Sequence, residues 1–338
     1  MGTLRFILAL LVMLSHTGLT VGGLNPGVAS VVVFYAISGY VMSALIAKHF
    51  SQPEQARHFY IDRLARIYPQ YLFYAAAAAV WFFSVGHATP FLQHTPSATD
   101  WVNNLLIVPL NFFMFNGADQ FSLVPPAWSL GAEVLFYAIA PWLWRYWRCA
   151  MLLAACSLGV QALAWHQVLP TDAWGYRLLP GVLWIFASGM ALQRYQQSHG
   201  VWVRYAVWGV PLFSTCMLLM LGTSGALQTP YNREVLLGFA VALPCIHLLS
   251  QGRLPEAWHA WDQRLGDWSY GLFLNHFFCM WVLDLAAPQT ALQWLTLIAC
   301  SVVLSVLTQR FLERPCVVWR QKRRQTWQLA HNPLKISA

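Results

Sequence analysis

Charged residues are scarce in this sequence. Only 9% of its 338 residues are Asp, Glu, Lys or Arg, and 58% are hydrophobic, whereas a soluble domain usually carries about 25% charged residues. A chain with so few charges cannot cover its surface in water, so an ordinary soluble domain is excluded. We therefore expect an all-α, polytopic membrane protein.

Cysteine pairs at metal-binding spacing are also missing. All seven cysteines lie in or beside apolar segments, and none has the spacing of a zinc site, so we expect no metal site and no structural disulfide. The cysteines are Cys149, Cys156, Cys216, Cys245, Cys279, Cys300 and Cys316. The formal charge of +8 comes from basic residues that punctuate apolar runs instead of forming one patch. We interpret them as topology signals and expect no nucleic-acid partner.

Long apolar runs dominate what is present. A transmembrane helix needs about 17 to 25 such residues, and ten segments meet this length to within a few residues. They are 4–21, 28–48, 67–86, 127–147, 149–166, 178–194, 202–222, 234–250, 268–286 and 290–311. A cleaved secretory signal is the alternative for the first segment, but "SHTGLTVGG" contains only a poor cleavage site.

The basic residues orient these helices. Ten spans place both termini on one side, and a cytoplasmic N-terminus leaves 18 of the 20 Lys and Arg residues on the cytoplasmic side. Only Arg177 and Arg233 then lie outside, which agrees with the positive-inside rule. Residues 1–318 would form the transmembrane domain, and 319–338 a basic cytoplasmic tail that frays from Arg320 onward.

The one long outer loop, 87–126, contains no lysine or arginine. Its apolar stretch "WVNNLLIVPLNFFMFN" is interrupted by Pro109 and carries several asparagines, including Asn104 and Asn111. A proline and buried amides do not suit a lipid-facing helix. We expect an interfacial or re-entrant segment instead of an eleventh span.

Three ionisable residues, His16, Glu133 and His276, lie deep within predicted spans on three different helices. Arg5 and His16 are eleven positions apart, so they share one helix face with about 16 Å between them. By the same helical rise, Glu133 lies about 10 Å below Pro126, and His276 about 13 Å above Asp267. The three groups therefore reach similar depth. We expect the roughly ten helices to surround a polar central cavity that these groups share. Plain hydrogen bonding between helices is the structural alternative.

Arg63 and Arg66 have i, i+3 spacing, so they lie on one face of a helical turn at the cytoplasmic mouth. Guanidinium groups match phosphate geometry. Together with Arg5 the pair favours a phosphate-bearing ligand, and simple topology signals are the alternative.

Six short motifs, spread from residue 4 to about 318, resemble those of the membrane-bound acyltransferase-3 family of bacterial surface-polysaccharide modifiers. In chain order they are an arginine, ten residues and a histidine at Arg5 and His16; "VFYAISGYVM" with Ser38; Arg63 and Arg66 before Pro69; "WSLGAEVLFY" with Trp128, Ser129 and Glu133; "SYGLFLNH" with Tyr270 and His276; and "FLERP" with Glu313 and Arg314. Two departures are mild. "GAE" replaces a two-carboxylate run, and Phe273 replaces an aromatic hydroxyl.

The resemblance implies transfer of an acyl group from cytoplasmic acyl-CoA, with acetyl-CoA the expected donor, to a hydroxyl of a surface polysaccharide, lipid-linked saccharide or similar acceptor. The enzyme would lie in the bacterial inner membrane and hold no permanent cofactor. His16 would act as general base with Glu133 orienting it, because histidine titrates near neutral pH. Arg5, Arg63 and Arg66 would bind the donor.

The remaining motif residues would bind substrate or support the structure: Ser38, Trp128, Ser129, Tyr270, His276, Glu313 and Arg314. A covalent role for Ser129 ranks below direct transfer. A transporter or flippase for a lipid-linked saccharide is the rival function, since it too needs a polar centre in a helix bundle. Transporters often contain inverted repeats, and none is visible in this sequence.

Overall fold

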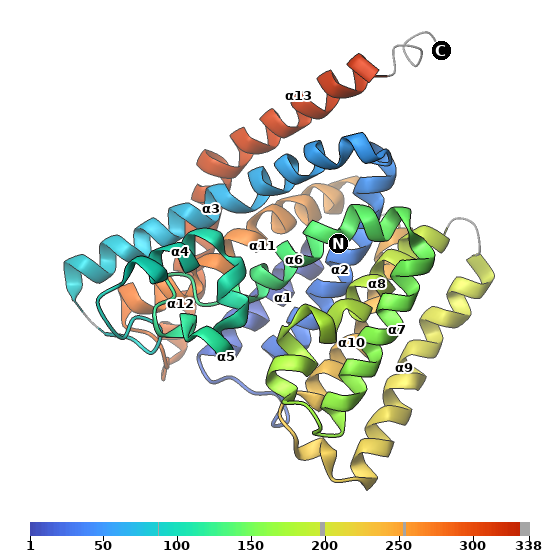
Figure 1. Cartoon of the computed structure of the whole chain (residues 1–338). Coiled ribbons are helices and arrows are strands. Elements are labelled where there is room, and N and C mark those ends of the chain that lie inside the picture. Colours follow the sequence, from blue (N-terminus) through green and yellow to red (C-terminus); the bar gives the residue numbers. More distant parts are fainter. Residues whose placement is uncertain (87, 197–199, 253–254, 332–338) are drawn as a thin grey trace.

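The computed structural model describes residues 1–86, 88–196, 200–252 and 255–331. Within these ranges every regular element is a helix, and β-type pairing is limited to three isolated bridges. The all-α prediction is therefore confirmed (Figure 1).

Each of the ten predicted segments coincides with a helix. These are α1 (Gly2–His16), α2 (Pro26–His49), α3 (Ala56–Val85), α6 (Ala127–Arg145), α7 (Trp147–Trp165), α8 (Leu179–Tyr195), α9 (Gly200–Thr223), α10 (Asn232–Gln251), α11 (Glu256–Leu283) and α12 (Ala291–Thr308). Among the described residues, six stretches are long and apolar enough to cross a membrane: α2, α7, α8 with the turn before it, α9, α10, and α12 with its continuation. Helix α1 is shorter, and α3, α6 and α11 carry many of the polar groups discussed below. The count of ten spans stays a prediction.

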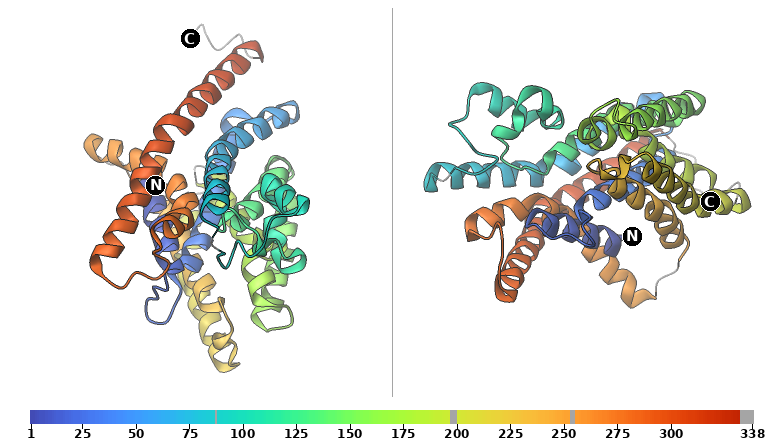
Figure 2. Two further views of the ribbon diagram at one scale, coloured as in Figure 1. Left: turned by 90° about the vertical axis from the view of Figure 1, so that its left-hand side faces the viewer. Right: turned by 90° about the horizontal axis from the view of Figure 1, so that it is seen from below.

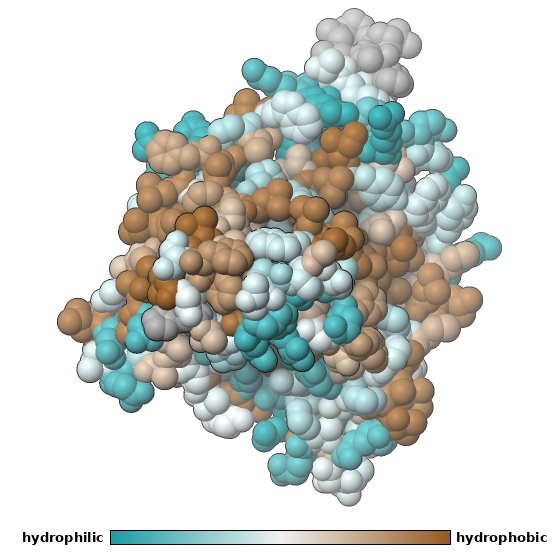
Figure 3. All heavy atoms as spheres, turned by 60° about the vertical axis from the view of Figure 1, so that its left-hand side comes forward, coloured by the Kyte–Doolittle hydropathy of each residue, from teal (hydrophilic) through white to brown (hydrophobic). Residues whose placement is uncertain are grey.

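The outside of the bundle is rich in apolar side chains. On α9, for example, Trp202, Tyr205, Leu212 and Leu219 are 74%, 70%, 67% and 68% exposed. Figure 3 shows hydrophobic residues across much of the middle of one face, with hydrophilic residues gathered toward its upper and lower ends. Exposed apolar surface on this scale fits lipid and not water. The chain is a multi-pass membrane protein.

Helix α2 is the centre of the bundle and packs against α1, α6, α8 and α10. Two glycines allow the closest of these approaches. A Cβ atom on Gly39 would collide with the carbonyl oxygen of Phe186, and one on Gly189 with that of Ala36. The α2–α8 contact therefore depends on both positions having no side chain. Figure 2 shows α1 and α2 within the bundle from two further sides.

The bundle has two ends, which we name by the position of the first residue. At the N-terminal end, the ammonium group of Met1 lies 3.0 Å from the carboxylate of Asp262, near the start of α11. At the distal end, the backbone N–H of Asn25 donates to Glu234 (3.2 Å), and Asn232 donates to the Trp165 carbonyl (3.3 Å). These contacts fix which helix termini lie together.

The predicted interfacial segment folds into short helices at the distal end. They are α4 (Ala98–Leu106), η2 (Val108–Phe112), α5 (Phe113–Asn116) and η3 (Ala118–Gln120). The asparagines stabilise it: Asn104 donates to the carbonyls of Asp100 and Phe121 (both 2.9 Å), and Asn111 to those of Trp128 (3.0 Å) and Arg177 (3.1 Å). None of these helices is long enough to span a membrane. Residue 87 lies outside the described residues.

The prediction that the chain frays from Arg320 is wrong as far as residue 331. A π-helical turn, η6 (Gln309–Glu313), joins α12 to a further helix, α13 (Arg314–His331). Figure 1 shows α13 running along α3 at the N-terminal end, and contacts between the two helices are direct. Two arginines hold it there, as described below. Residues 332–338, with Lys335, lie outside the described residues.

Candidate active site

Three adjoining cavities lie between the helices. The N-terminal cavity, of about 150 Å³, is lined by polar residues from five helices. They are Arg5, Tyr35, Ser38, Arg63, Arg66, Ser129, Glu133, Tyr137, Ser269 and Tyr270. The middle cavity, of about 90 Å³, shares Val31, Ser129 and Phe273 with it. The distal cavity, of about 210 Å³, shares His16, Trp128 and Arg177 with the middle one.

Helix α1 lines this series of cavities. Arg5 borders the N-terminal cavity, whereas His16 borders both the middle and distal cavities. Arg5 and His16 thus each border a cavity, whereas one shared central cavity stays a prediction. The Arg5 side chain forms no hydrogen bond or ion pair with any described residue. It is therefore a cation available to a ligand.

Arg66 is held by a carboxylate from the far end of the chain. It forms an ion pair with Glu313, and Gln70 donates to the other oxygen of that carboxylate (2.9 Å). The Arg66 guanidinium also lies 4.8 Å from the ring centre of Tyr270, whose hydroxyl donates to the Ile67 carbonyl (2.9 Å). The "FLERP" glutamate thus holds Arg66, which lines the N-terminal cavity, without lining it itself. Arg314 is exposed and lines none of these cavities.

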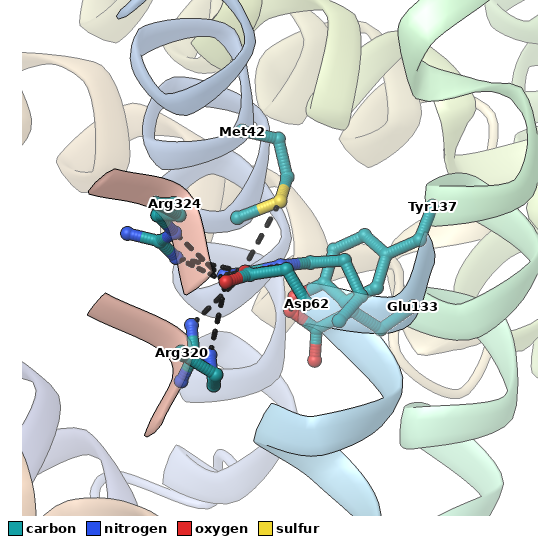
Figure 4. A network of polar contacts seen from close by, with 7 residues as sticks. Met42, Asp62, Glu133, Tyr137, Arg320 and Arg324 are labelled. Carbon is teal, nitrogen blue, oxygen red and sulfur yellow. Dashed lines mark hydrogen bonds and ion pairs between the residues drawn. The ribbon is translucent and has the colours of Figure 1, made fainter. Parts of the chain in front are cut away.

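Arg63 belongs to a second cluster, built around Asp62. Figure 4 shows Asp62 between Arg320 and Arg324. The Asp62 carboxylate accepts from the adjacent Arg63, from Arg320 (both bonds 3.1 Å) and from Arg324 (both bonds 2.8 Å). Burial alone raises the pKa of Asp62, but the hydrogen bonds from Arg324 and Arg320 and the charge of Arg63 outweigh it and hold the pKa well below its usual range. One carboxylate therefore fixes three guanidinium groups.

These pairings correct our interpretation of Arg63 and Arg66. We expected the pair to bind a phosphate-bearing ligand or to be simple topology signals, but each side chain forms an ion pair with a buried carboxylate. Replacing them would leave Asp62 or Glu313 without a partner and so would change the fold as well as any ligand site. Asp62 was missed altogether. Its sequence signal was an isolated acid within the basic stretch "RHFYIDRLAR".

We expected Glu133 to lie within hydrogen-bond reach of His16, directly or through one water, and the described structure shows no direct bond between them. Glu133 accepts instead from the hydroxyls of Ser38 on α2 and Tyr137 one turn further along α6. The Tyr137 ring in turn lies 5.9 Å from the Arg63 guanidinium. Glu133 lines the N-terminal cavity only, whereas His16 lines the other two.

His16 packs against His276, the other histidine that was predicted to lie at this depth. The rings of His16 and His276 are stacked, with centres 5.4 Å apart and planes 16° from parallel. Nδ1 of His276 lies 3.2 Å from the Leu272 carbonyl, and its Nε2 has no hydrogen-bond partner among the described residues. His276 is fully buried and lines none of the three cavities, so it contacts His16 from behind.

Ser129 and Trp128 separate the cavities. The Ser129 hydroxyl donates to the Pro126 carbonyl (3.0 Å), and no histidine lies within hydrogen-bond distance to activate it as a nucleophile in the described part of the chain. The Trp128 ring lies 4.3 Å from the Arg177 guanidinium. Arg177 was placed outside by charge counting and taken as a topology signal only. The structure puts it beside His16 in two cavities.

Comparisons with known proteins agree with the motifs. Residues 2–310 match the family described as an acyltransferase domain. An uncharacterized protein of Aquifex aeolicus is 32% identical over 166 residues, which cover 48% of this chain and 72% of that protein. Acyltransferase MdmB of Streptomyces mycarofaciens is 26% identical over 346 aligned positions, covering 88% and 83%. No solved structure matches. The chain therefore belongs to the acyltransferase-3 family and is an acyl-transferring enzyme.

Proposed function

We propose that this enzyme transfers an acetyl or similar acyl group from cytoplasmic acyl-CoA to a hydroxyl of a saccharide acceptor at the bacterial inner membrane. The observation that carries the proposal is the position of His16, which borders both the middle and the distal cavity. A general base at such a junction can serve a donor that enters from one end and an acceptor that enters from the other.

The donor enters at the N-terminal end. We take this end as cytoplasmic, because the predicted topology places 18 of the 20 Lys and Arg residues on the cytoplasmic side together with the N-terminus. Arg5, whose side chain forms no ion pair with a described carboxylate, is available to a phosphate of coenzyme A at the N-terminal cavity. The pantetheine arm would follow the cavity past Ser129 and Phe273, the residues shared with the middle cavity.

The transfer is a direct substitution at the thioester. His16 takes the proton from the acceptor hydroxyl as its oxygen bonds to the carbonyl carbon. The carbon–sulfur bond then breaks, and coenzyme A leaves as the thiolate. The proton from the acceptor hydroxyl stays on the His16 imidazolium. His276 stacks on His16 and limits its rotation, so we assign it a positioning role. Glu133 orients Ser38 and Tyr137 in the donor cavity instead of orienting His16.

A labelling experiment tests the proposal. Membranes that contain the protein are supplied with [14C]acetyl-CoA, and base-labile label is counted in the envelope saccharides. We expect label to depend on the protein, and mass spectrometry of saccharides from a deletion strain to show lost O-acyl groups. A flippase would change the amount or location of the saccharide without any acyl transfer, and that result would overturn the proposal.

Donor binding gives a prediction for Arg5. Arg5→Gln is expected to weaken coenzyme A binding about tenfold, equivalent to ~1.4 kcal/mol, because one charged contact with phosphate is lost. Calorimetric titration of the purified protein measures this. Arg57→Gln is the matched control, since Arg57 is exposed at the same end and lines none of the cavities. Equal affinities in the two variants would remove Arg5 from the donor site.

A further inference from the structure

The distal cavity has the composition of a binding site. At about 210 Å³ it is much larger than one water molecule. Aromatic rings from three parts of the chain form much of its wall, namely Phe91, Phe113, Trp128 and Phe277. Four polar or ionisable side chains also face it: His16, Asp119, Ser122 and Arg177. Apolar ring faces with a few convergent polar groups are typical of small-molecule sites.

Arg177 lines this cavity, and some of its hydrogen-bond donors have no partner among the described residues. Its Nε donates to Asp172 (2.7 Å), and its guanidinium lies 4.3 Å from the Trp128 ring and 5.0 Å from that of Phe113. Asn111 also fixes the residue through its backbone carbonyl (3.1 Å). The two terminal amino groups of Arg177 have no hydrogen-bond partner within the described ranges. A rigidly held guanidinium therefore presents free donors to the cavity.

The charge of the cavity selects the class of ligand. Arg177 supplies donors, while Asp119, which has no ion-pair partner in the described structure, supplies acceptors. A carboxylate on the ligand would be attracted by Arg177 but repelled by Asp119, and the charge of Arg177 is already partly offset by Asp172. A neutral ring with several hydroxyls satisfies both groups, because each hydroxyl both donates and accepts.

We infer that the distal cavity is the acceptor site and that it takes an uncharged sugar ring, held by Arg177 and Asp119 with one hydroxyl turned toward His16. This inference rests on the proposed acyl transfer and adds the place and chemical class of the acceptor. Trp128 and the phenylalanines would pack on the apolar faces of the ring.

The test separates acceptor binding from donor binding. In the membrane labelling assay, Asp119→Asn and Arg177→Lys are expected to raise the apparent KM for the endogenous acceptor about tenfold and to leave the KM for acetyl-CoA unchanged. Arg177→Lys keeps the charge but loses the planar fork. Arg233→Lys is the matched control: it lies at the distal end and lines none of the cavities, so both KM values should stay at wild-type level.

Two soluble probes test the chemical class. Methyl β-D-glucopyranoside should compete with the endogenous acceptor in the wild-type enzyme, and Asp119→Asn should weaken that competition. Methyl β-D-glucuronide, which carries a carboxylate, should compete at least tenfold less well. Stronger competition by the glucuronide, no competition by either probe, or a changed acetyl-CoA KM in both cavity variants would overturn the inference. A wild-type protein that binds coenzyme A but transfers no label would instead refute the proposed function itself.

Discussion

His16→Ala is expected to lower the rate of acyl transfer by about 10² to 10⁴, the usual contribution of a general base. His16 borders the two cavities in which donor and acceptor would meet, and no other ionisable base is shared by both. Coenzyme A affinity should stay at the wild-type value, because the donor contacts lie at Arg5. Label transfer in membranes and calorimetric titration of the purified variant measure the two quantities separately.

Three comparisons sharpen this test. His166→Ala should have no effect, since His166 is exposed and lines none of the cavities. His276→Gln should cause a smaller loss than His16→Ala, because His276 touches the base and not the substrates. Added imidazole should restore part of the activity of His16→Ala by entering the vacated cavity and accepting the proton. A His16→Ala enzyme with most of the wild-type rate would exclude His16 as the base.

Asp62→Asn is expected to destabilise the protein by about 3 to 5 kcal/mol, the range for breaking a buried ion pair. Arg63, Arg320 and Arg324 would be left close together with no carboxylate between them (Figure 4). Unfolding in mixed micelles measures the stability. Trypsin should also cleave α13 faster, because the contact of α13 with Asp62 would be weakened.

The same carboxylate predicts how stability depends on pH. Its pKa in the folded protein lies below the value of about 3.9 in an unfolded chain. The stabilisation is therefore fully present above that ordinary value and is lost as the pH falls through the folded-state pKa. The loss below pH ~4 should be smaller in Asp62→Asn than in the wild type, because this group no longer titrates.

Two further variants serve as controls for Asp62. Glu54→Gln removes an exposed acid at the same end of the bundle and should change stability by less than about 0.5 kcal/mol. Adding Arg324→Gln to Asp62→Asn should recover part of the lost stability, because one of the uncompensated charges is removed. If Asp62→Asn and Glu54→Gln are equally stable, the cluster does not hold α13 in place.

The helices could be predicted from sequence because lipid imposes a length and a composition on each of them. All ten apolar segments correspond to helices, and the "WVNNLLIVPLNFFMFN" stretch does not form a spanning one. The prediction failed at the tail. Arg320 and Arg324 looked like a solvated basic run, and only the distant Asp62 explains why that run is an ordered helix.

Glu133 and His16 show the limit of estimates of depth. Counting residues gives the position of a side chain along a helix axis, at ~1.5 Å per residue, and both were placed at a similar level. It does not give the rotation of one helix against another or the distance between their axes. The rotation and spacing of the helices determine that Glu133 accepts hydrogen bonds from Ser38 and Tyr137, and that His16 stacks on His276.

The sequence by itself determined the helical membrane architecture, the family, and most of the polar residues that line the N-terminal cavity, because periodic burial and local motifs are properties of neighbouring residues. Only the tertiary structure decided which charges are free. Arg63 and Arg66 form ion pairs with Asp62 and Glu313, while the Arg5 side chain forms none with a described residue. Arg177 likewise became a cavity residue only through packing with Trp128. A charge in a low-dielectric bundle is defined by its partner, and here that partner can lie more than 200 residues away in the chain.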